Sequence, residues 1–213
     1  MVKGRGRRLL RLVAVLAGGA ALVAGCGGTG AQYVTNHDAG FFLRVPNSWQ
    51  RFDIEESQRP DDATADAWQV FLDANDDPTV DHLNTVDVEQ PVALVEVRPL
   101  LSAQRQQVSL GYLRSLVLGG QADPLNLVSS GDPDIELVAY EELTEADGHW
   151  GSWIVVTVGT GGDGEPVTIG HQVMVDPDLT TMYRLQVACQ AACYDDHRQE
   201  IDRVFSSWTI EEQ

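Results

Sequence analysis

Basic residues are scarce in this chain, whose 213 residues include 14 lysines and arginines against 32 aspartates and glutamates. Five of the 14 lie within the first 11 residues: Lys3, Arg5, Arg7, Arg8 and Arg11. Beyond residue 25, nine basic and 32 acidic residues remain, a formal charge of −23 against −18 for the whole chain. So negative a surface repels phosphate backbones, and no basic stripe is present to follow one. We therefore expect no nucleic-acid partner, and we interpret the charge as serving solubility in an exposed, salty setting.

Recognisable catalytic motifs are also missing. Ser152 follows Gly151, but the second glycine of the nucleophile elbow Gly-x-Ser-x-Gly is absent. The acidic pairs 141–142 and 195–196 are chain neighbours, and strand neighbours point to opposite faces, whereas glycosidases need two carboxyls facing across a cleft. The glycine-rich segment 159–164 is not followed by the helix that a phosphate-binding loop requires. We expect no catalytic residue and no cofactor, so the protein is predicted not to be an enzyme.

The sequence shows no metal-ligand pair at helical spacing, because its five histidines are scattered. They are His37, His82, His149, His171 and His197. The acidic loop from Asp73 starts like a calcium loop, but Pro78 stands where the EF-hand requires glycine and Asn84 where it requires glutamate. We expect no metal, with two interpretations of this loop left open: a solvated acidic loop, or a calcium site of another type. The latter would use four aspartates, Asp73, Asp76, Asp77 and Asp81.

The first 25 residues have the composition of a secretory signal. After the basic front, residues 12–23 consist almost wholly of Leu, Val, Ala and Gly. This run is too short to span a hydrocarbon core of about 30 Å, which needs roughly 20 residues. A charged start, a short apolar run and small residues at its end are the marks of a signal peptide that directs export.

The end of that segment, Leu22-Val23-Ala24-Gly25-Cys26, resembles the bacterial lipobox. The resemblance implies cleavage before Cys26 and a diacylglyceryl group, with further palmitate-type acylation, on that residue. Stable anchoring needs two or more chains, and an acidic domain is itself repelled by anionic head groups. We therefore predict a lipoprotein that its lipid holds on the extracytoplasmic face of the cell membrane. The predicted divisions are a signal peptide at 1–25, a flexible tether at 26–36 and a single domain at 37–213.

With Cys26 assigned to the lipid, Cys189 and Cys193 remain as an even pair. Outside the cytoplasm such a pair is expected to be oxidised. Its spacing is not the Cys-x-x-Cys of thioredoxin-type sites. We predict a structural disulfide that fixes the angle between a strand and the following helix, with a redox centre as the alternative.

Hydrophobic periodicity predicts an α+β domain, because antiparallel strands run in series and the helices lie elsewhere in the chain. The predicted strands are 41–46, 50–54, 91–99, 135–143, 150–158, 167–176 and 182–189, with a short one at 208–210. The predicted helices lie between 61 and 75, at 102–118 and at 194–206. The five tryptophans could line a groove, but we favour core packing. They are Trp49, Trp68, Trp150, Trp153 and Trp208, of which the pair at 150 and 153 should face opposite sides of one strand.

Both ends of the domain resemble the PsbP/Mog1-like family. Residues 40–49, with Pro46 and Trp49, are similar to its opening strand, and residues 201–210 to its closing helix and strand. The order of helices and strands resembles that of the family over about residues 40–211. The acidic insert at 53–83 differs from the family pattern. The resemblance implies an antiparallel sheet packed with helices, and binding rather than catalysis, since members include accessory subunits of photosystems and a small-GTPase partner. Many actinobacterial surface lipoproteins are similar.

Three functions follow as hypotheses from these observations. The first is a non-catalytic binding or accessory lipoprotein that docks a protein partner in the cell envelope. The second is a small-ligand or lipid carrier, which requires a deep apolar pocket between sheet and helices. The third is an envelope hydrolase, which requires a cleft that gathers a histidine or carboxylates.

Overall fold

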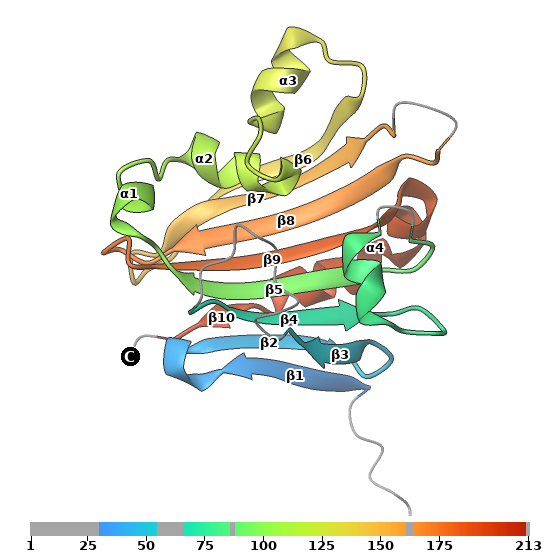
Figure 1. Cartoon of the computed structure of the whole chain (residues 1–213), viewed down its shortest axis with the longest axis horizontal. Coiled ribbons are helices and arrows are strands. Elements are labelled where there is room, and N and C mark those ends of the chain that lie inside the picture. Colours follow the sequence, from blue (N-terminus) through green and yellow to red (C-terminus); the bar gives the residue numbers. More distant parts are fainter. Residues whose placement is uncertain (1–29, 55–65, 86–87, 161–163, 212–213) are drawn as a thin grey trace, which may run out of the picture.

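The computed structural model describes residues 30–54, 66–85, 88–160 and 164–211, and two antiparallel sheets dominate it (Figure 1). The larger sheet has seven strands in the order β3-β4-β5-β9-β8-β7-β6. In chain order they are β3 Gln50–Asp53, β4 Trp68–Asp73, β5 Val92–Pro99, β6 Ile135–Thr144, β7 Trp150–Val158, β8 Val167–Val175 and β9 Thr181–Gln190. The last four strands form a meander of hairpins, as their turn-type links predicted.

The small sheet contains three strands in the order β1-β2-β10: β1 Ala31–Asn36, β2 Phe41–Pro46 and β10 Thr209–Ile210. A short 3-10 helix, η1 His37–Ala39, joins β1 to β2, and Gly40 ends it in the left-handed region at φ 63°. This sheet therefore brings together segments from the two ends of the described chain.

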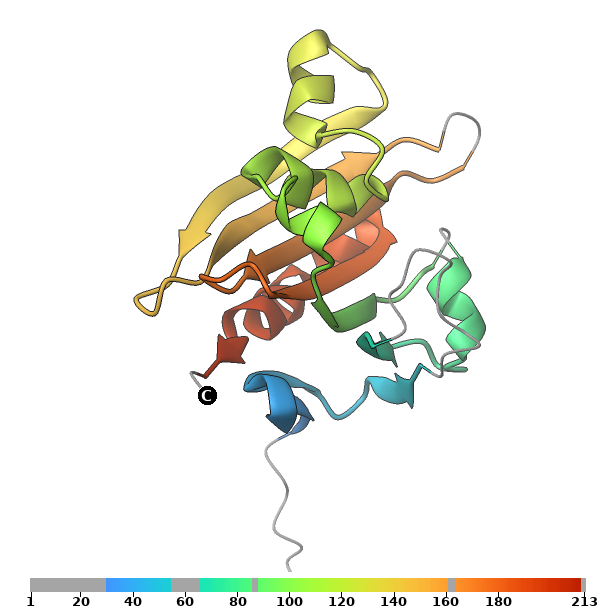
Figure 2. The same ribbon diagram turned by 60° about the vertical axis from the view of Figure 1, so that its left-hand side comes forward.

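One face of the large sheet is covered by α4 Ala191–Ser206 together with the small sheet, as Figure 2 shows. The main core lies here, and it joins Phe41 and Leu43 of β2, Leu185 and Val187 of β9, and Val204 of α4. Alternation along β9 explains this placement, because every second side chain of a strand points to the same face.

Short helices cover the opposite face of the large sheet. They are α2 Leu110–Ser115 and the 3-10 helix η4 Leu116–Leu118. The four-residue α1 Ser102–Arg105 follows β5 and buries none of its residues, and α3 Pro124–Ser130 lies beside β6. A second cluster there packs Leu113 of α2 against Val173, Val175 and Met182 of the sheet. A further 3-10 helix, η3 Val80–Asn84, follows β4.

The structure corrects three sequence-based expectations. The helix predicted between 61 and 75 is wrong, because Trp68–Asp73 is strand β4. The continuous apolar run of this strand is buried, and periodicity alone does not distinguish such a run from a buried helix. Residues 61–65 lie outside the described residues. The predicted tether 26–36 extends too far, because residues 31–36 pair with β2 as strand β1.

The third correction concerns the helix predicted at 102–118, which is divided into α1, α2 and η4. Ser109 interrupts the helix because its side chain accepts a hydrogen bond from the backbone of Tyr112 and so caps a new helix. Helix α3, with Asp123 as its N-cap and Pro124 in its first turn, was not predicted.

Candidate functional site

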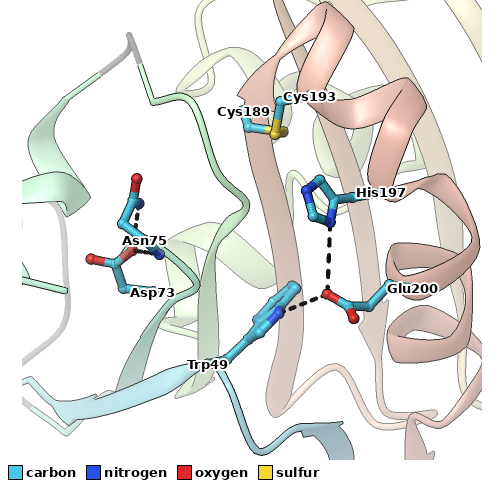
Figure 3. Close-up of a disulfide and its surroundings, with 7 residues drawn as sticks. All are labelled: Trp49, Asp73, Asn75, Cys189, Cys193, His197 and Glu200. Carbon is cyan, nitrogen blue, oxygen red and sulfur yellow. Dashed lines mark hydrogen bonds and ion pairs between the residues drawn. A yellow bond between two sulfur atoms is a disulfide. The ribbon is translucent and has the colours of Figure 1, made fainter. Parts of the chain in front are cut away.

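The predicted disulfide is present: Cys189, near the end of β9, is bonded to Cys193 in the first turn of α4, with their Cα atoms 6.0 Å apart (Figure 3). Both residues are buried. A redox centre must meet its partner at the surface, so the geometry favours the structural interpretation. The bond fixes the start of α4 to the strand that leads into it.

A second contact holds α4 against the small sheet. The indole Nε1 of Trp49, which follows β2, donates a hydrogen bond of 3.0 Å to Oε1 of Glu200. The Nδ1 atom of His197 lies 4.0 Å from the same oxygen (Figure 3). Trp49 is therefore a core residue with a satisfied N–H group, as the packing interpretation of the tryptophans predicted.

The acidic loop after β4 is organised by Asp73 itself. Its side chain is buried, and its carboxylate accepts hydrogen bonds from the backbone of Asn75 and of Thr79 at 2.9 Å and contacts Nδ1 of His82 at 2.7 Å. Burial raises the pKa of Asp73, but bonds from Asn75, Thr79 and His82 together outweigh it, so the pKa lies below its usual value. Asp76 and Asp77 are exposed.

These contacts bear on the calcium alternative. The carboxylate of Asp73 is occupied by N–H donors of its own loop, which leaves it poorly placed to bind a cation. Across the described ranges, no group of three or more His, Cys, Asp or Glu side chains is gathered in a way that could hold a metal ion. Asp81 is the first-turn acidic residue of η3, and Thr79 caps that helix.

A buried polar network lies on the large sheet where the short helices cover it, and sequence reasoning missed it. Glu96 accepts a 2.9 Å hydrogen bond from Nε2 of Gln69, and its carboxylate lies 3.9 Å from Arg98 and 3.8 Å from Arg184. Arg184 also donates to Nε2 of His171 at 3.1 Å. The register offered a signal, since Gln69 and Glu96, and Glu96 and Arg184, are direct cross-strand partners.

This network connects the sheet to its helical cover. Nη2 of Arg184 donates to the backbone carbonyl of Leu116 in η4 at 3.1 Å. His171 is fully buried, and burial, with Arg184 beside it, holds its pKa well below the usual value, so the imidazole is neutral. We interpret the network as structural, because buried charges must be paired and hydrogen-bonded.

The hydrolase hypothesis finds little support in this geometry. Ser152 and His171 lie on adjacent strands, but both side chains are buried and no hydrogen bond joins them in the described structure. A nucleophile and its base must lie within hydrogen-bond reach of each other and of a substrate. Glu141 and Glu142 lie on β6, and Asp195 and Asp196 lie in α4, so the two acidic pairs belong to separate elements.

The carrier hypothesis requires a deep apolar pocket between sheet and helices. In the described part of the chain this space is filled by large side chains of the main core. Among the fully buried ones are Trp49, Tyr194, Phe41, Leu43, Leu72 and Leu185. Gly170 of β8 makes the packing tight, because a Cβ atom there would overlap the hydroxyl of Tyr194 and lie 2.8 Å from Phe205.

The candidate binding site is an open groove of about 350 Å³, which we call the hairpin groove. It lies between the turn that joins β6 to β7, strand β8 and strand β10. Its lining residues are Glu145, Ala146, Asp147, Gln172, Met174, Trp208, Thr209 and Ile210. Three segments far apart in the sequence thus form one surface.

The hairpin groove combines an apolar centre with an acidic rim. Trp208 packs edge-on against Phe41 at 5.3 Å, and its Nε1 has no hydrogen-bond partner within the described residues. On the rim, Asp147 lies 2.8 Å from Nδ1 of His149, and hydrogen bonds from the backbone and side chain of His149 lower the pKa of Asp147. Trp208 and Ile210 supply the accessible apolar surface, whereas Met174 is 1% exposed. An aromatic centre with charge at the rim is typical of protein–protein interfaces.

The remaining tryptophans follow the packing interpretation. Trp68 and Trp153 pack against the main core, whereas Trp150 packs against the second cluster on the opposite face. Trp150 and Trp153 therefore face opposite sides of β7, as their spacing predicted. Trp208 has both roles that were weighed, because it packs against the core and also lines the hairpin groove.

The predicted lipid attachment residue, Cys26, lies outside the described residues. No helix in the part of the chain that the structure describes is long and apolar enough to cross a membrane.

Comparison with known proteins shows similarity in fold. No family model matches the chain, and no curated protein sequence matches it. Among solved structures, cyanobacterial PsbP (CyanoP) from Synechocystis sp. PCC 6803 is similar, with 18% identity over 89% of this chain and 99% of that chain and a TM-score of 0.50. The Ran-binding protein Mog1p of Saccharomyces cerevisiae matches with 8% identity over 84% of this chain and 95% of its own, at a TM-score of 0.44. The comparison confirms the predicted α+β architecture, and we conclude that this chain has a PsbP-like fold.

Proposed function

We propose that this protein is an actinobacterial-type lipoprotein of the cell envelope that binds a protein partner through the hairpin groove, without catalysing a reaction. The lipobox ending in Cys26 supports the anchor. The groove itself is the observation that supports docking, because it sets the partly exposed Trp208 and Ile210 beside the acidic side chains of Glu145 and Asp147 on an open surface. The partner is expected to present an apolar side chain flanked by lysine or arginine, since charge complementarity steers association.

Anchoring is tested separately from docking. In the proposed lipoprotein the thiol of Cys26 carries the diacylglyceryl group, so Cys26→Ser should leave the signal uncleaved at this site and the protein without lipid. We expect mass spectrometry of the native N-terminal peptide to find an acylated cysteine, which the serine variant lacks. An unmodified Cys26 would contradict the anchor and leave the groove to be judged by the next experiment.

Docking is tested by crosslinking in the cells that make the protein. A photo-crosslinking amino acid replaces Thr209, which is exposed and lines the groove, or Ser129, which is exposed on α3 beside the other end of the sheet. We expect one polypeptide to crosslink from position 209 and not from 129. Crosslinking from neither position, or equally from both, would contradict a partner in this groove.

The charge of the rim gives a matched pair of variants. Glu145→Lys reverses an exposed charge that lines the groove, and Glu141→Lys reverses an exposed charge on β6 outside it. With a basic partner, Glu145→Lys should reduce the adduct from position 209 several-fold and slow association, whereas Glu141→Lys should leave it unchanged. Equal effects would indicate a response to net charge alone.

A further inference from the structure

Acidic residues are nearly absent from the start of the folded domain. Between residues 27 and 52 the sequence contains a single one, Asp38, although the whole chain has 32. Strands β1 and β2 contain none. Asp38 lies in η1, at the end of the hairpin opposite Ala31, because Ala31 pairs with Pro46 and the other end of β1 leads into η1. The half of the small sheet nearest to residue 30 is therefore free of carboxylates.

The outer face of this half presents an aromatic ring and a guanidinium. Alternate residues of β2, from Phe41 to Val45, are buried in the core, so Arg44 points away from it. Tyr33 is the direct cross-strand partner of Arg44 and is 65% exposed, the most of any large apolar side chain in the described ranges. Tyrosine is enriched at membrane–water interfaces, and arginine binds phosphate through a planar fork of donors.

A second arginine faces Arg44 across an open groove. The groove has a volume of about 530 Å³, and Arg44 lies on its β2 side and Arg203 on its α4 side, with Gly30 at its edge. Neither arginine forms an ion pair with any other described residue. Glu200 also lines this groove, but its carboxylate accepts the indole N–H of Trp49. We call Tyr33, Arg44, Pro46 and Arg203 the tether-side patch.

The length of chain between the patch and the lipid limits where the patch can lie. Cys26 precedes Gly30 by four residues, which span about 14 Å at most when fully extended. If acyl chains on Cys26 enter the bilayer, Gly30 stays within that distance of the head groups. Figures 1 and 2 show β1 at the outer side of the molecule, away from the large sheet.

We propose that the tether-side patch lies against phospholipid head groups and fixes the orientation of the domain on the membrane. Arg44 and Arg203 bind lipid phosphate, and the ring of Tyr33 enters the interface beside them. This inference rests on the proposed lipid anchor at Cys26. It refines the expectation from net charge: the lipid provides attachment, the patch provides orientation, and distant carboxylates are screened beyond about 10 Å. The arrangement also turns the acidic remainder of the surface away from the membrane.

The experiment uses the full mature protein with its native lipid, reconstituted into vesicles of phosphatidylcholine and phosphatidylglycerol. A fluorophore is attached at Thr35→Cys, on the same outer face as Tyr33, or at Val138→Cys, exposed on β6 of the large sheet. Nitroxide-labelled head groups quench a fluorophore that lies at the membrane surface. We expect strong quenching at position 35 and little at 138.

Charge reversal then separates the patch from the anchor. Arg44→Glu combined with Arg203→Glu should lower quenching at position 35 to the level found at 138. Arg105→Glu combined with Arg198→Glu, an equal change of charge outside the patch, should leave it unchanged. Equal quenching at 35 and 138, or quenching that survives the patch reversal, would overturn the proposal.

Flotation of the vesicles reports anchoring by itself. Protein that does not float refutes the lipid anchor and the patch together, whereas protein that floats without selective quenching refutes the patch alone. The fluorophore at position 35 can also be tested with an aqueous quencher. If the fluorophore is shielded in native envelopes but not in lipid vesicles, a protein covers this face, and the proposal is overturned.

Discussion

Trp49 and Glu200 are joined by a hydrogen bond of 3.0 Å between side chains 151 positions apart in the sequence. Trp49 is 1% exposed and follows β2, whereas Glu200 lies on α4. The bond therefore fastens the helix to the small sheet and satisfies the indole N–H of a core residue at the same time.

Removing the acceptor should weaken this connection. Glu200→Ala leaves the indole N–H of Trp49 unpaired, which costs about 1–3 kcal/mol for a buried polar group, and we expect the lower end because Glu200 is half-exposed. Urea unfolding followed by tryptophan fluorescence measures the change. Glu200→Gln keeps an acceptor oxygen and should recover most of the stability. Equal losses in both variants would show that the charge, and not the hydrogen bond, matters.

Gly170 determines how closely α4 packs on the sheet. Gly170→Ala places a methyl group against the hydroxyl of Tyr194 and the ring of Phe205, and overpacking of this kind costs about 1–3 kcal/mol. A Cβ atom at Gly30 meets nothing within 4 Å, so Gly30→Ala is the matched control. Thermal unfolding should show a lower melting temperature for the first variant and little change for the second. An unchanged melting temperature for Gly170→Ala would contradict the prediction and show that α4 moves to accommodate the methyl group without loss of stability.

The disulfide should stabilise the domain modestly, because it closes a loop with a sequence separation of only four. Chain entropy for so short a loop gives about 2 kcal/mol. Replacing both cysteines by alanine should lower the midpoint of urea unfolding accordingly. Dithiothreitol should lower the midpoint of the native protein and leave the double variant unaffected. A midpoint in the native protein that does not respond to reduction would contradict the prediction.

His171 should make the domain sensitive to mild acid. Its folded-state pKa is lowered below the unfolded value of about 6.5, so the unfolded state binds the proton first as the pH falls. Stability is complete above about pH 6.5 and decreases below it. His171→Gln should be less stable at pH 7 but should lose less between pH 7 and 5. Parallel pH profiles for the two proteins, measured by urea unfolding, would exclude His171 as the source.

Helices and strands were predicted correctly where the hydrophobic pattern and the turn residues agreed on one type of element. The strands from β6 to β9 are separated by clusters of turn residues, and the region from Tyr194 to Ser206 shows a clear helical stripe. Strand β4 was mistaken for helix because Ala65, Trp68, Phe71 and Leu72 recur at helical spacing. The burial of Val70, Phe71 and Leu72 in succession shows a strand that is covered on both faces. Strand β1 has the composition of a tether, and only its pairing with β2 makes it a strand.

The candidate site was less predictable, because it depends on distance in space. Cys189 and Cys193 could be paired from their number and spacing. The hairpin groove needs Asp147, Met174 and Trp208 to meet, and no spacing in the sequence indicates this. The buried charges of Glu96 and Arg184 resembled solvent-facing strand residues, since covering helices cannot be assigned to a face from sequence alone.

The two strand partners of β2 determine when the small sheet can form during folding. One neighbour of β2 comes from residues 31–36 and the other from residues 209–210, and Arg44 exchanges hydrogen bonds with Ser207 across 163 positions. A hairpin of β1 and β2 alone is at best marginally stable in water. The small sheet therefore closes only after nearly the whole domain has been synthesised, and contacts of such long range form slowly. If the chain is exported unfolded, the small sheet cannot form until β10 has passed through the membrane, so the chain stays free to move through the export channel until then.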